Sequence, residues 1–209
     1  SLKEYKHFKD IMNSVTPIVM FDRVADGINC DKVVVDDFDS AYDATTHLIK
    51  LGSKKIALLS TIHNLSVGKL RLDGYKKALS DANMSIDENL IIQETSIEDF
   101  DVQLQQLISS KKMDAIFALD EHSSTMTMRM ALKQGIKIPE ELNIIGFADG
   151  VWSRRLTPSL STVSQHAPEI GAKAAELLIH KLNSKDEFYQ PKTVVIKTEL
   201  RQRESTRKL

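Results

Sequence analysis

The chain has 209 residues, of which 42% are hydrophobic and 27% are charged, and its formal net charge at pH 7 is −1. This composition is typical of a globular protein with a sizeable core, and the charge balance provides no net attraction to nucleic acid or membrane. The single cysteine, Cys30, excludes an intramolecular disulfide and fits a reducing, cytoplasmic compartment. No apolar run reaches the roughly 18–20 residues that span a bilayer, and no signal peptide precedes the first strand, so we expect no membrane contact.

Hydrophobic periodicity and turn residues predict alternating strands and helices along the chain. Strands are predicted at 17–23, 31–37, 54–60, 89–93, 113–119 and 142–147, and 192–200 is a last strand or a bent pair. Helices are predicted at 40–52, 68–84, 99–110, 123–135 and 169–183. The strict β-α alternation and the apolar, non-alternating strands indicate βαβ units. We therefore expect an α/β fold with a parallel sheet, helices on both faces, and 142–147 as its last strand.

Signatures of catalysis and of metal binding are missing from the sequence. It contains no G-x-G-x-x-G, no Walker phosphate loop, no G-x-S-x-G and no H-E-x-x-H. Its six histidines and one cysteine are scattered, without metal-ligand spacing. We therefore expect no enzyme activity, no cofactor and no metal.

Charged side chains collect where the predicted parallel strands end, which is the edge at which α/β sheets bind ligands. Asp22 and Arg23 follow the first strand, and Asp120 and Asp149 follow two later strands. Arg71 lies early in a helix, where a cation opposes the helix dipole. Asp and Arg together would fix the hydroxyl, carboxylate or phosphate groups of a small ligand.

Each of these residues also has a structural alternative. Asp120 precedes a helix and can cap it, and Asp149 can close a turn. Arg71 can form a structural ion pair with Asp22 or with Asp120. These alternatives stay open from the sequence alone.

Three further features of the sequence also have structural interpretations. Asp37, just ahead of the first long helix, is expected to be a cap or a solvated acid. Trp152 lies in an otherwise polar loop and is a pocket lid, an interface residue or a loop-packing residue. Met126, Met128 and Met130 alternate on one helix, so we expect them to fill the core and an interface rather than bind a metal.

Six stretches occur in an order that resembles a known family. They read PIVMFDR, VVVDDFDSAYDATTHLIKLGSKKIALL, RLDGYKKAL, DAIFALDE, GIKIPEELNIIGFADG and TPSLSTVSQHAPEIGAKAAELLIHKL. Together they resemble the effector-binding core of the lac repressor-like (LacI/GalR) transcriptional regulators, over about residues 15–204. IPEELNIIGF and PSLSTVSQ are the most specific parts.

The resemblance implies a periplasmic-binding-protein-like fold of two α/β subdomains joined by three crossovers, with an effector bound between them. Residues 1–35 and 165–185 would form a partial N-terminal subdomain. Residues 36–164 and 186–204 would form a complete C-terminal subdomain, and 205–209 a tail. The basic end RQRESTRKL (201–209) is itself expected to be solvated. A DNA-binding helix-turn-helix head, a hinge helix and the opening βα units would lie upstream of residue 1.

The resemblance carries effector contacts over to some positions only. Asp22 and Arg23 match the family's F-D-R strand exit, and Arg71 matches an arginine that commonly contacts effector. The family often reads A-N-D where this chain has Ala118-Leu119-Asp120, so Leu119 replaces a polar residue.

A second departure follows the strand 142–147. The family often reads G-[FY]-D there, and Ala148 stands at the position of its ligand-binding Asp, with Asp149 one position later. The stretch 94–97 also lacks the aromatic residue on which sugars often stack. We therefore expect fewer hydroxyl-reading groups than in a typical sugar sensor.

The resemblance implies the ligand-sensing and dimerisation domain of a LacI-type regulator. A small-molecule effector, a sugar or related metabolite, would control operator binding by the head, and the chain would form a homodimer that meets DNA only through that head. The alternative is a sugar-binding protein of a transport system, which would need a secretion signal.

Overall fold

A computed structural model of the chain describes residues 8, 11, 16–25, 27–147, 149–184 and 189–208. Two compact units divide the chain: unit 1 comprises Ser1–Asp36 and His166–Lys197, and unit 2 comprises Asp37–Gln165 and Thr198–Leu209. Among the helices in the described ranges, none combines the length and the apolar character that a membrane crossing requires.

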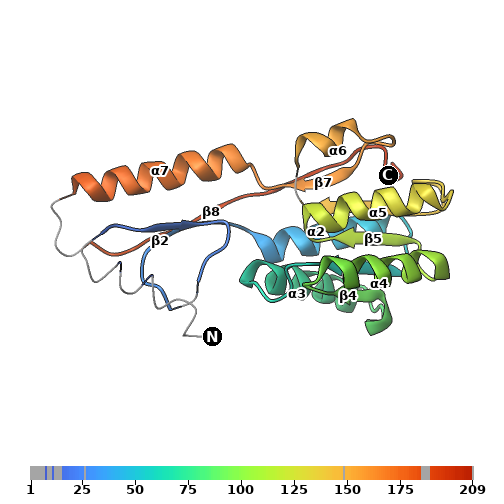
Figure 1. Cartoon of the computed structure of the whole chain (residues 1–209). Coiled ribbons are helices and arrows are strands. Elements are labelled where there is room, and N and C mark those ends of the chain that lie inside the picture. The colour runs from blue at the N-terminus through green and yellow to red at the C-terminus, as the bar shows by residue number, and fades with distance from the viewer. Residues whose placement is uncertain are drawn as a thin grey trace. The chain divides into compact units, whose positions relative to one another are not determined.

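Unit 1 is built on a three-stranded parallel sheet in the order β1-β2-β8. Its elements are β1 (Val19–Phe21), β2 (Asp31–Val35), β8 (Thr193–Ile196) and helix α7 (Ala167–Asn183). Helix α7 runs along one face of this sheet (Figure 1). Ile170, Ala174 and Leu177 recur at helical spacing and pack on Val33 and Val35, which alternate along β2.

Unit 2 contains a six-stranded sheet in the order β4-β3-β5-β6-β7-β9. Its strands are β3 (Ile56–Ser60), β4 (Ile91–Gln93), β5 (Ala115–Ala118), β6 (Asn143–Phe147), β7 (Ser161–Ser164) and β9 (Glu199–Arg201). Neighbouring strands are parallel except β9, which runs antiparallel to β7. Its helices are α2 (Asp37–Lys50), α3 (Ser66–Asp81), α4 (Ile97–Ser110), α5 (Glu121–Lys133) and α6 (Val151–Arg155), with a 3-10 turn η1 (Glu88–Leu90).

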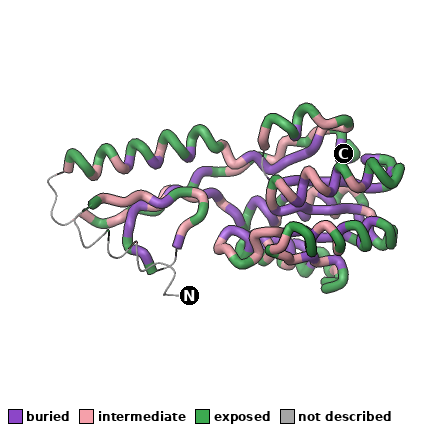
Figure 2. The backbone as a smooth tube through the Cα atoms, viewed as in Figure 1, coloured by how far each residue is buried: buried purple, intermediate pink, exposed green. Residues whose placement is uncertain are grey.

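Two layers of helices cover the faces of this sheet. Helices α2 and α3 pack on one face, and α4 and α5 pack on the other. Successive strand residues point to opposite faces, so Leu58 joins the α2–α3 core while Leu59 joins the α4–α5 core. Figure 2 shows the strands as buried tubes between half-exposed helices. The predicted α/β fold, with a parallel sheet and helices on both faces, is confirmed for this unit.

The stretch predicted at 192–200 is a bent pair whose two strands belong to different units. Strand β8 pairs with β2 in unit 1, whereas β9 pairs with β7 in unit 2. The chain therefore returns to unit 2 at Thr198. This corrects the expectation that the second subdomain resumes at residue 186. The sequence did not show the boundary, because an extended chain has no periodicity that marks where it changes partners.

The segment 201–206 is part of the fold of unit 2, which corrects the expectation of a solvated end at 201–209 for these residues; Leu209 lies outside the described residues. Ser205 and Thr206 are buried. The Ser205 hydroxyl donates to the carbonyl of Ile144 at 2.6 Å and accepts from the amide of Ser161 at 2.8 Å. Hydrogen-bonding side chains, rather than apolar ones, hold this segment, so hydrophobic patterning does not reveal it.

Two elements after β6 were not predicted, namely α6 and β7. Strand β7 lies beyond β6 in the parallel sheet, so the expectation that 142–147 is the last parallel strand is wrong. Its sequence, STVS, is mostly polar, yet all four residues are buried. The hydroxyls bond inside the unit, as in the 2.8 Å contact between Ser161 Oγ and Thr206 Oγ1. A buried strand of this kind lacks the apolar run by which strands are recognised.

Candidate functional site

The carboxyl ends of β3, β5 and β6 lie at one edge of the sheet in unit 2. Leu59 pairs with Ala118, and Ala118 pairs with Gly146, in parallel register. The residues that follow these three strands therefore emerge side by side, and this part of unit 2 is called the carboxyl edge below. Ligands of open α/β sheets bind at such edges.

Arg71 is fixed at the carboxyl edge from three sides. Its Nε atom lies 2.7 Å from Oδ1 of Asp37, and its Nη1 atom donates to the carbonyl of Leu119 at 2.6 Å. The guanidinium lies over the Phe147 ring, with Cζ 3.4 Å from the ring centroid. The Arg71 and Asp37 side chains are 3% and 2% exposed, so the pair is removed from water. A buried guanidinium is tolerable because the carboxylate, the carbonyl and the ring face balance its charge.

The partner of Arg71 differs from the expectation. The sequence suggested Asp22 or Asp120, whereas the ion pair is formed with Asp37. Asp37, expected as a cap or a solvated acid, is buried in the first turn of α2. A carboxylate there is stabilised by the helix dipole as well as by the guanidinium. The pair thus joins α2 to α3 beneath the carboxyl edge.

Asp120 combines a helix cap with a link between two loops. Its Oδ1 atom accepts from the amide of Ser123 at 2.8 Å, and the Ser123 hydroxyl completes a capping box at the start of α5. Its Oδ2 atom accepts from the amide of Thr61, which follows β3, at 2.8 Å. Asp120 and Arg71 lie at the same edge, since Leu119, which holds Arg71, directly precedes Asp120.

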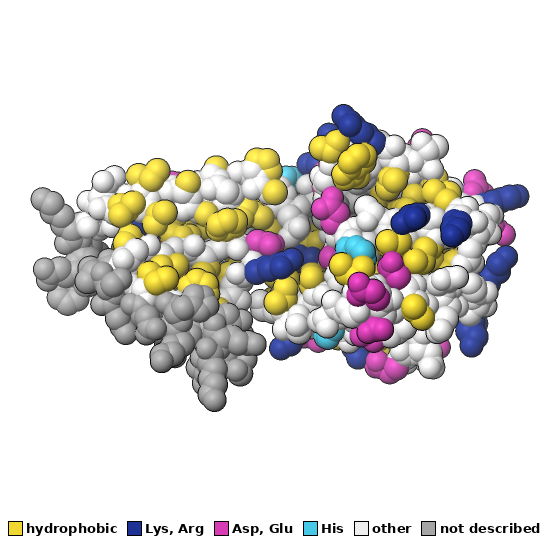
Figure 3. Space-filling view, in the orientation of Figure 1, with side chains coloured by type: hydrophobic (Ala, Val, Ile, Leu, Met, Phe, Trp, Pro, Cys, Tyr) yellow, Lys and Arg dark blue, Asp and Glu magenta, His cyan; other side chains and the backbone are white. Residues whose placement is uncertain are grey.

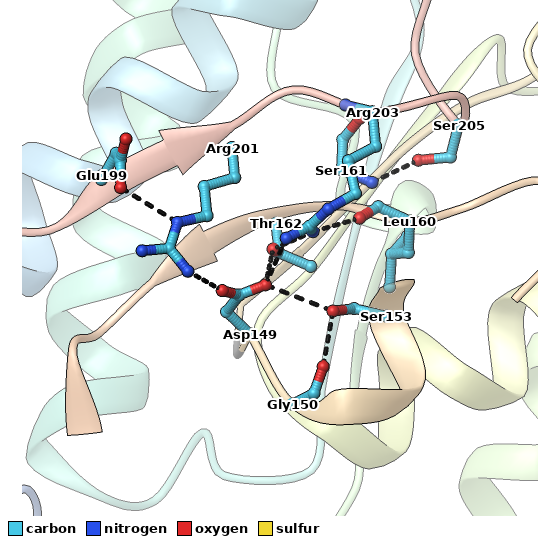
Figure 4. Close-up of polar contacts among 10 residues, drawn as sticks. All are labelled: Asp149, Gly150, Ser153, Leu160, Ser161, Thr162, Glu199, Arg201, Arg203 and Ser205. Carbon is cyan, nitrogen blue, oxygen red and sulfur yellow. Dashed lines mark hydrogen bonds and ion pairs between the residues drawn. The ribbon is translucent and has the colours of Figure 1, made fainter. Parts of the chain in front are cut away.

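Asp149 lies at the centre of a polar network at the exit of β6 (Figure 4). Its Oδ1 atom accepts from Arg203 Nη2 at 2.6 Å, from Thr162 Oγ1 at 3.0 Å and from Ser153 Oγ at 3.2 Å. Its Oδ2 atom forms an ion pair with Arg201. With only 6% of its side chain exposed, Asp149 ties α6, β7 and β9 together.

The network keeps the Asp149 carboxyl ionised. Burial by itself raises the pKa of this group, but the hydrogen bonds from Arg203 and Thr162 and the nearby guanidinium charges lower the pKa to about 2. Arg201 and Arg203 were not singled out from the sequence. Their spacing of two on an extended segment places both on one face of the sheet, and this was the available signal.

The other candidate residues occupy separate positions. Asp22 and Arg23 belong to unit 1, where Arg23 Nε lies 3.9 Å from Asp22 Oδ2 and both side chains are exposed. Asp22 has a φ of 58°, which is uncommon for a residue other than glycine. Trp152 is in α6 of unit 2 and is 63% exposed. Ala148 lies outside the described residues. Of the residues described, no three His, Cys, Asp or Glu side chains are grouped to hold a metal ion.

The chain is similar in sequence to a known domain family and to known transcriptional regulators. A family model described as a periplasmic binding protein-like domain matches residues 45–206. The HTH-type transcriptional regulator DegA of Bacillus subtilis is 32% identical over 79% of this chain and 49% of its own length. The ribose operon repressor of Haemophilus influenzae is 32% identical over 83% of this chain and 53% of its own length.

A solved structure of a transcriptional regulator also resembles this chain. The complex of the transcriptional regulator CelR with cellobiose superposes with a TM-score of 0.84 at 25% identity, covering 93% of this chain and 60% of that one. The chain spans about half the length of the curated relatives it matches.

Proposed function

The chain belongs to the periplasmic binding protein-like domain family, and we propose that it is the effector-sensing and dimerising part of a LacI-type transcriptional regulator. The resemblance to LacI/GalR regulators that the sequence indicated is confirmed by relatives such as DegA and the ribose operon repressor. They favour a regulator over the transport alternative, and they are named as regulators rather than as enzymes. The protein is proposed to act in the cytoplasm.

The observation that carries the proposal is the family match over residues 45–206, which includes almost all of unit 2 with its carboxyl edge. Arg71 stands at this edge, at the position where the resemblance implies an effector contact, and it is held rigidly by Asp37 and Phe147. A polar group fixed before the ligand arrives loses little conformational entropy on binding. This preorganisation suits a sensor of small polar molecules.

Within unit 2 we propose Arg71 and Asp120 as the principal effector contacts. Asp149, whose two carboxylate oxygens are engaged by Arg203 and Arg201, remains a predicted contact. Asp22 and Arg23 in unit 1 remain predicted contacts.

The proposed effector is a sugar or a related metabolite. Support comes from a relative named for the ribose operon and from a solved structure that is described as a complex with cellobiose. The effector would prefer one arrangement of the regulator and thereby shift the population that binds operator DNA, which is a linkage effect. DNA itself would be bound by a helix-turn-helix head attached to this part.

Ligand binding is tested by thermal-shift screening of sugars, sugar phosphates and nucleobases, followed by calorimetry on hits. Arg71→Lys keeps the positive charge but loses the fork that bonds Asp37 and Leu119, so we expect at least tenfold weaker binding, equivalent to about 1.4 kcal/mol. Asp120→Asn probes the second contact, and Lys112→Ala, an exposed position elsewhere on unit 2, is the control. Equal affinity for a hit in Arg71→Lys and in the unaltered chain would remove Arg71 from the site.

DNA binding is tested by electrophoretic mobility shift at physiological salt. With a formal net charge of −1, the chain has no net counterion-release drive, so we expect no shift by this chain alone. A specific shift would contradict the assignment of DNA binding to a separate head.

A further inference from the structure

We propose that unit 2 contains a second ligand site, at the opposite end of its sheet from the carboxyl edge, and that this site binds a small organic phosphate monoester. The inference goes beyond the proposed effector site and does not rest on it. A polar cavity and two cations without carboxylate partners point to this ligand.

The cavity lies at the amino ends of β6 and β7. It is lined by Pro139 and Ser159, which precede these strands, and by residues of the C-terminal segment 202–208, and its volume is about 790 Å³. Cavities that hold small molecules in proteins measure roughly 300–1,000 Å³. A bare inorganic ion would fill little of this space, so the cavity suits an anion that carries an organic body.

The segment that forms much of the cavity is fixed by hydrogen bonds. The amide of Ser205 donates to the carbonyl of Ser159 at 2.9 Å, and the amide of Arg207 donates to Oδ1 of Asn143 at 2.9 Å. The Gln202 side chain donates to the carbonyl of Arg207 at 2.6 Å. The walls of the cavity are therefore in place before a ligand arrives, which lowers the entropic cost of binding.

Two cations at the cavity are available to an anion. Arg207 and Lys208 are exposed and form no ion pair with any residue in the described ranges. Nη2 of Arg207 donates to the carbonyl of Glu140, which orients the guanidinium. Arg203 also lines the cavity, but its guanidinium points to Asp149, which balances its charge (Figure 4). A guanidinium and an ammonium together match the charge of a phosphate dianion.

Glu204 also lines the cavity, and its charge opposes an anion. Its Oε2 atom accepts from the amide of Ser159 at 2.8 Å and from the Ser159 hydroxyl at 2.9 Å. These hydrogen bonds lower the pKa of the Glu204 carboxyl, so it is ionised at neutral pH. Arg207 and Lys208 set against Glu204 leave one positive charge in excess. Removing the Glu204 charge should therefore strengthen the binding of an anion, whereas a ligand that carries an ammonium group would lose an attractive partner.

Binding is tested by calorimetry on the whole chain with glycerol 3-phosphate. We expect saturable binding with a dissociation constant of about 1 mM or below. Glycerol should not bind, because it lacks the charge, and inorganic phosphate should bind more weakly, because it lacks the organic body. Inorganic phosphate that binds as tightly as the ester would mean an adventitious ion only and would overturn the proposal.

Three variants locate the ligand, with circular dichroism melts to establish that each is folded. Arg207→Gln/Lys208→Gln should raise the dissociation constant for glycerol 3-phosphate at least about tenfold. Basic side chains occur at several places on the surface of unit 2 (Figure 3), so a control for charge is needed. Lys50→Gln/Lys112→Gln imposes the same change in net charge at exposed positions elsewhere and should bind like the unaltered chain. Glu204→Gln should lower the dissociation constant about threefold or more.

The opposite effects expected at Arg207/Lys208 and at Glu204 make the assignment sharp. The proposal is overturned if the unaltered chain shows no saturable binding, or if the Arg207/Lys208 variant binds as tightly as the control. Weaker binding by folded Glu204→Gln would indicate a ligand with a positive group and would overturn the phosphate assignment.

Arg71→Lys separates this site from the proposed effector site. It should leave glycerol 3-phosphate binding unchanged, because Arg71 stands at the carboxyl edge; loss of binding in this variant alone would place the ligand there and overturn the proposal. Conversely, Arg207→Gln/Lys208→Gln should retain the affinity for any effector found by screening. Failure of one site is therefore distinguishable from failure of the other.

Discussion

The guanidinium of Arg71 and the carboxylate of Asp37 form a buried ion pair, with Nε and Oδ1 2.7 Å apart and both side chains almost fully excluded from water. The pair joins the starts of two neighbouring helices, α2 and α3, below the edge at which we propose that effector binds. The stability of unit 2 and its proposed function are therefore linked, because the contact that holds the two helices together also fixes the direction of the Arg71 guanidinium.

Removing one partner of this pair should destabilise unit 2 strongly. Asp37→Ala leaves the Arg71 charge buried without its carboxylate, and we expect a loss of about 3–5 kcal/mol in the free energy of unfolding. The double variant Asp37→Leu/Arg71→Met removes both charges and should lose less of the free energy of unfolding. Urea unfolding measures this free energy for both variants. Lys77→Ala breaks the exposed Lys77–Asp81 pair and should leave the midpoint unchanged. Equal losses in the single and double variants would contradict this account.

Asp149 should make stability depend on pH in the acid range. Its pKa is about 2 in the folded chain, below the ordinary value of 3.8, so the folded state favours the ionised form. The contribution is complete above about pH 4 and disappears as pH falls towards 2, and it amounts to about 2 kcal/mol. Asp149→Asn should remove this contribution to the pH dependence of stability, whereas Asp73→Asn, at an exposed position, should retain it. Denaturant midpoints at several pH values provide the measurement; parallel curves for Asp149→Asn and the unaltered chain would rule the effect out.

Gly74 permits the close approach of α2 and α3. A Cβ atom there would lie 2.3 Å from the carbonyl oxygen of Phe38 and 3.0 Å from Cβ of Ala41. Gly74→Ala should therefore force the helices apart and cost about 1–3 kcal/mol despite the better helix propensity of alanine. Gly171→Ala, in α7 of unit 1, meets nothing within 4 Å and should stabilise its helix by up to about 1 kcal/mol. Thermal melts that shift in the same direction for both variants would contradict this explanation.

Ser205 should contribute to stability although only four residues follow it in the chain. Ser205→Ala leaves the buried carbonyl of Ile144 and the buried amide of Ser161 without its hydroxyl, at a cost of about 1–3 kcal/mol. Ser85→Ala changes an exposed serine and should stay within about 0.5 kcal/mol of the unaltered chain. If Ser205→Ala also stays within about 0.5 kcal/mol of the unaltered chain, the solvated end that the sequence suggested is favoured instead.

The fold class could be predicted from the sequence because its signals are local. Apolar runs such as 113–119 and amphipathic helices such as 99–110 repeat with a regular alternation, and parallel strands covered on both faces need that pattern. Strand β7 escaped this reasoning because its buried residues are serine, threonine and valine. The place where the chain passes from one unit to the other escaped it as well, because β8 and β9 look alike until their partners are known.

The candidate site was predicted in part. Residue type and position at strand exits identified Arg71, Asp120 and Asp149 as polar groups near the carboxyl edge, and their roles as effector contacts remain predictions. Only the tertiary structure decided their neighbours, because Arg71 and Asp37 are 34 residues apart and Asp149 and Arg203 are 54 apart.

The sequence by itself determined most of the helices and strands, their order, and the family to which they point. The tertiary structure decided that Asp149 is held between two arginines, that Arg71 is balanced by Asp37, and that residues 205–206 are core rather than tail. The physical reason is that secondary structure follows from periodicity within a short window, whereas the partner of a buried charge follows from how distant segments stack. Burial makes that partner necessary, but periodicity does not say which residue it is.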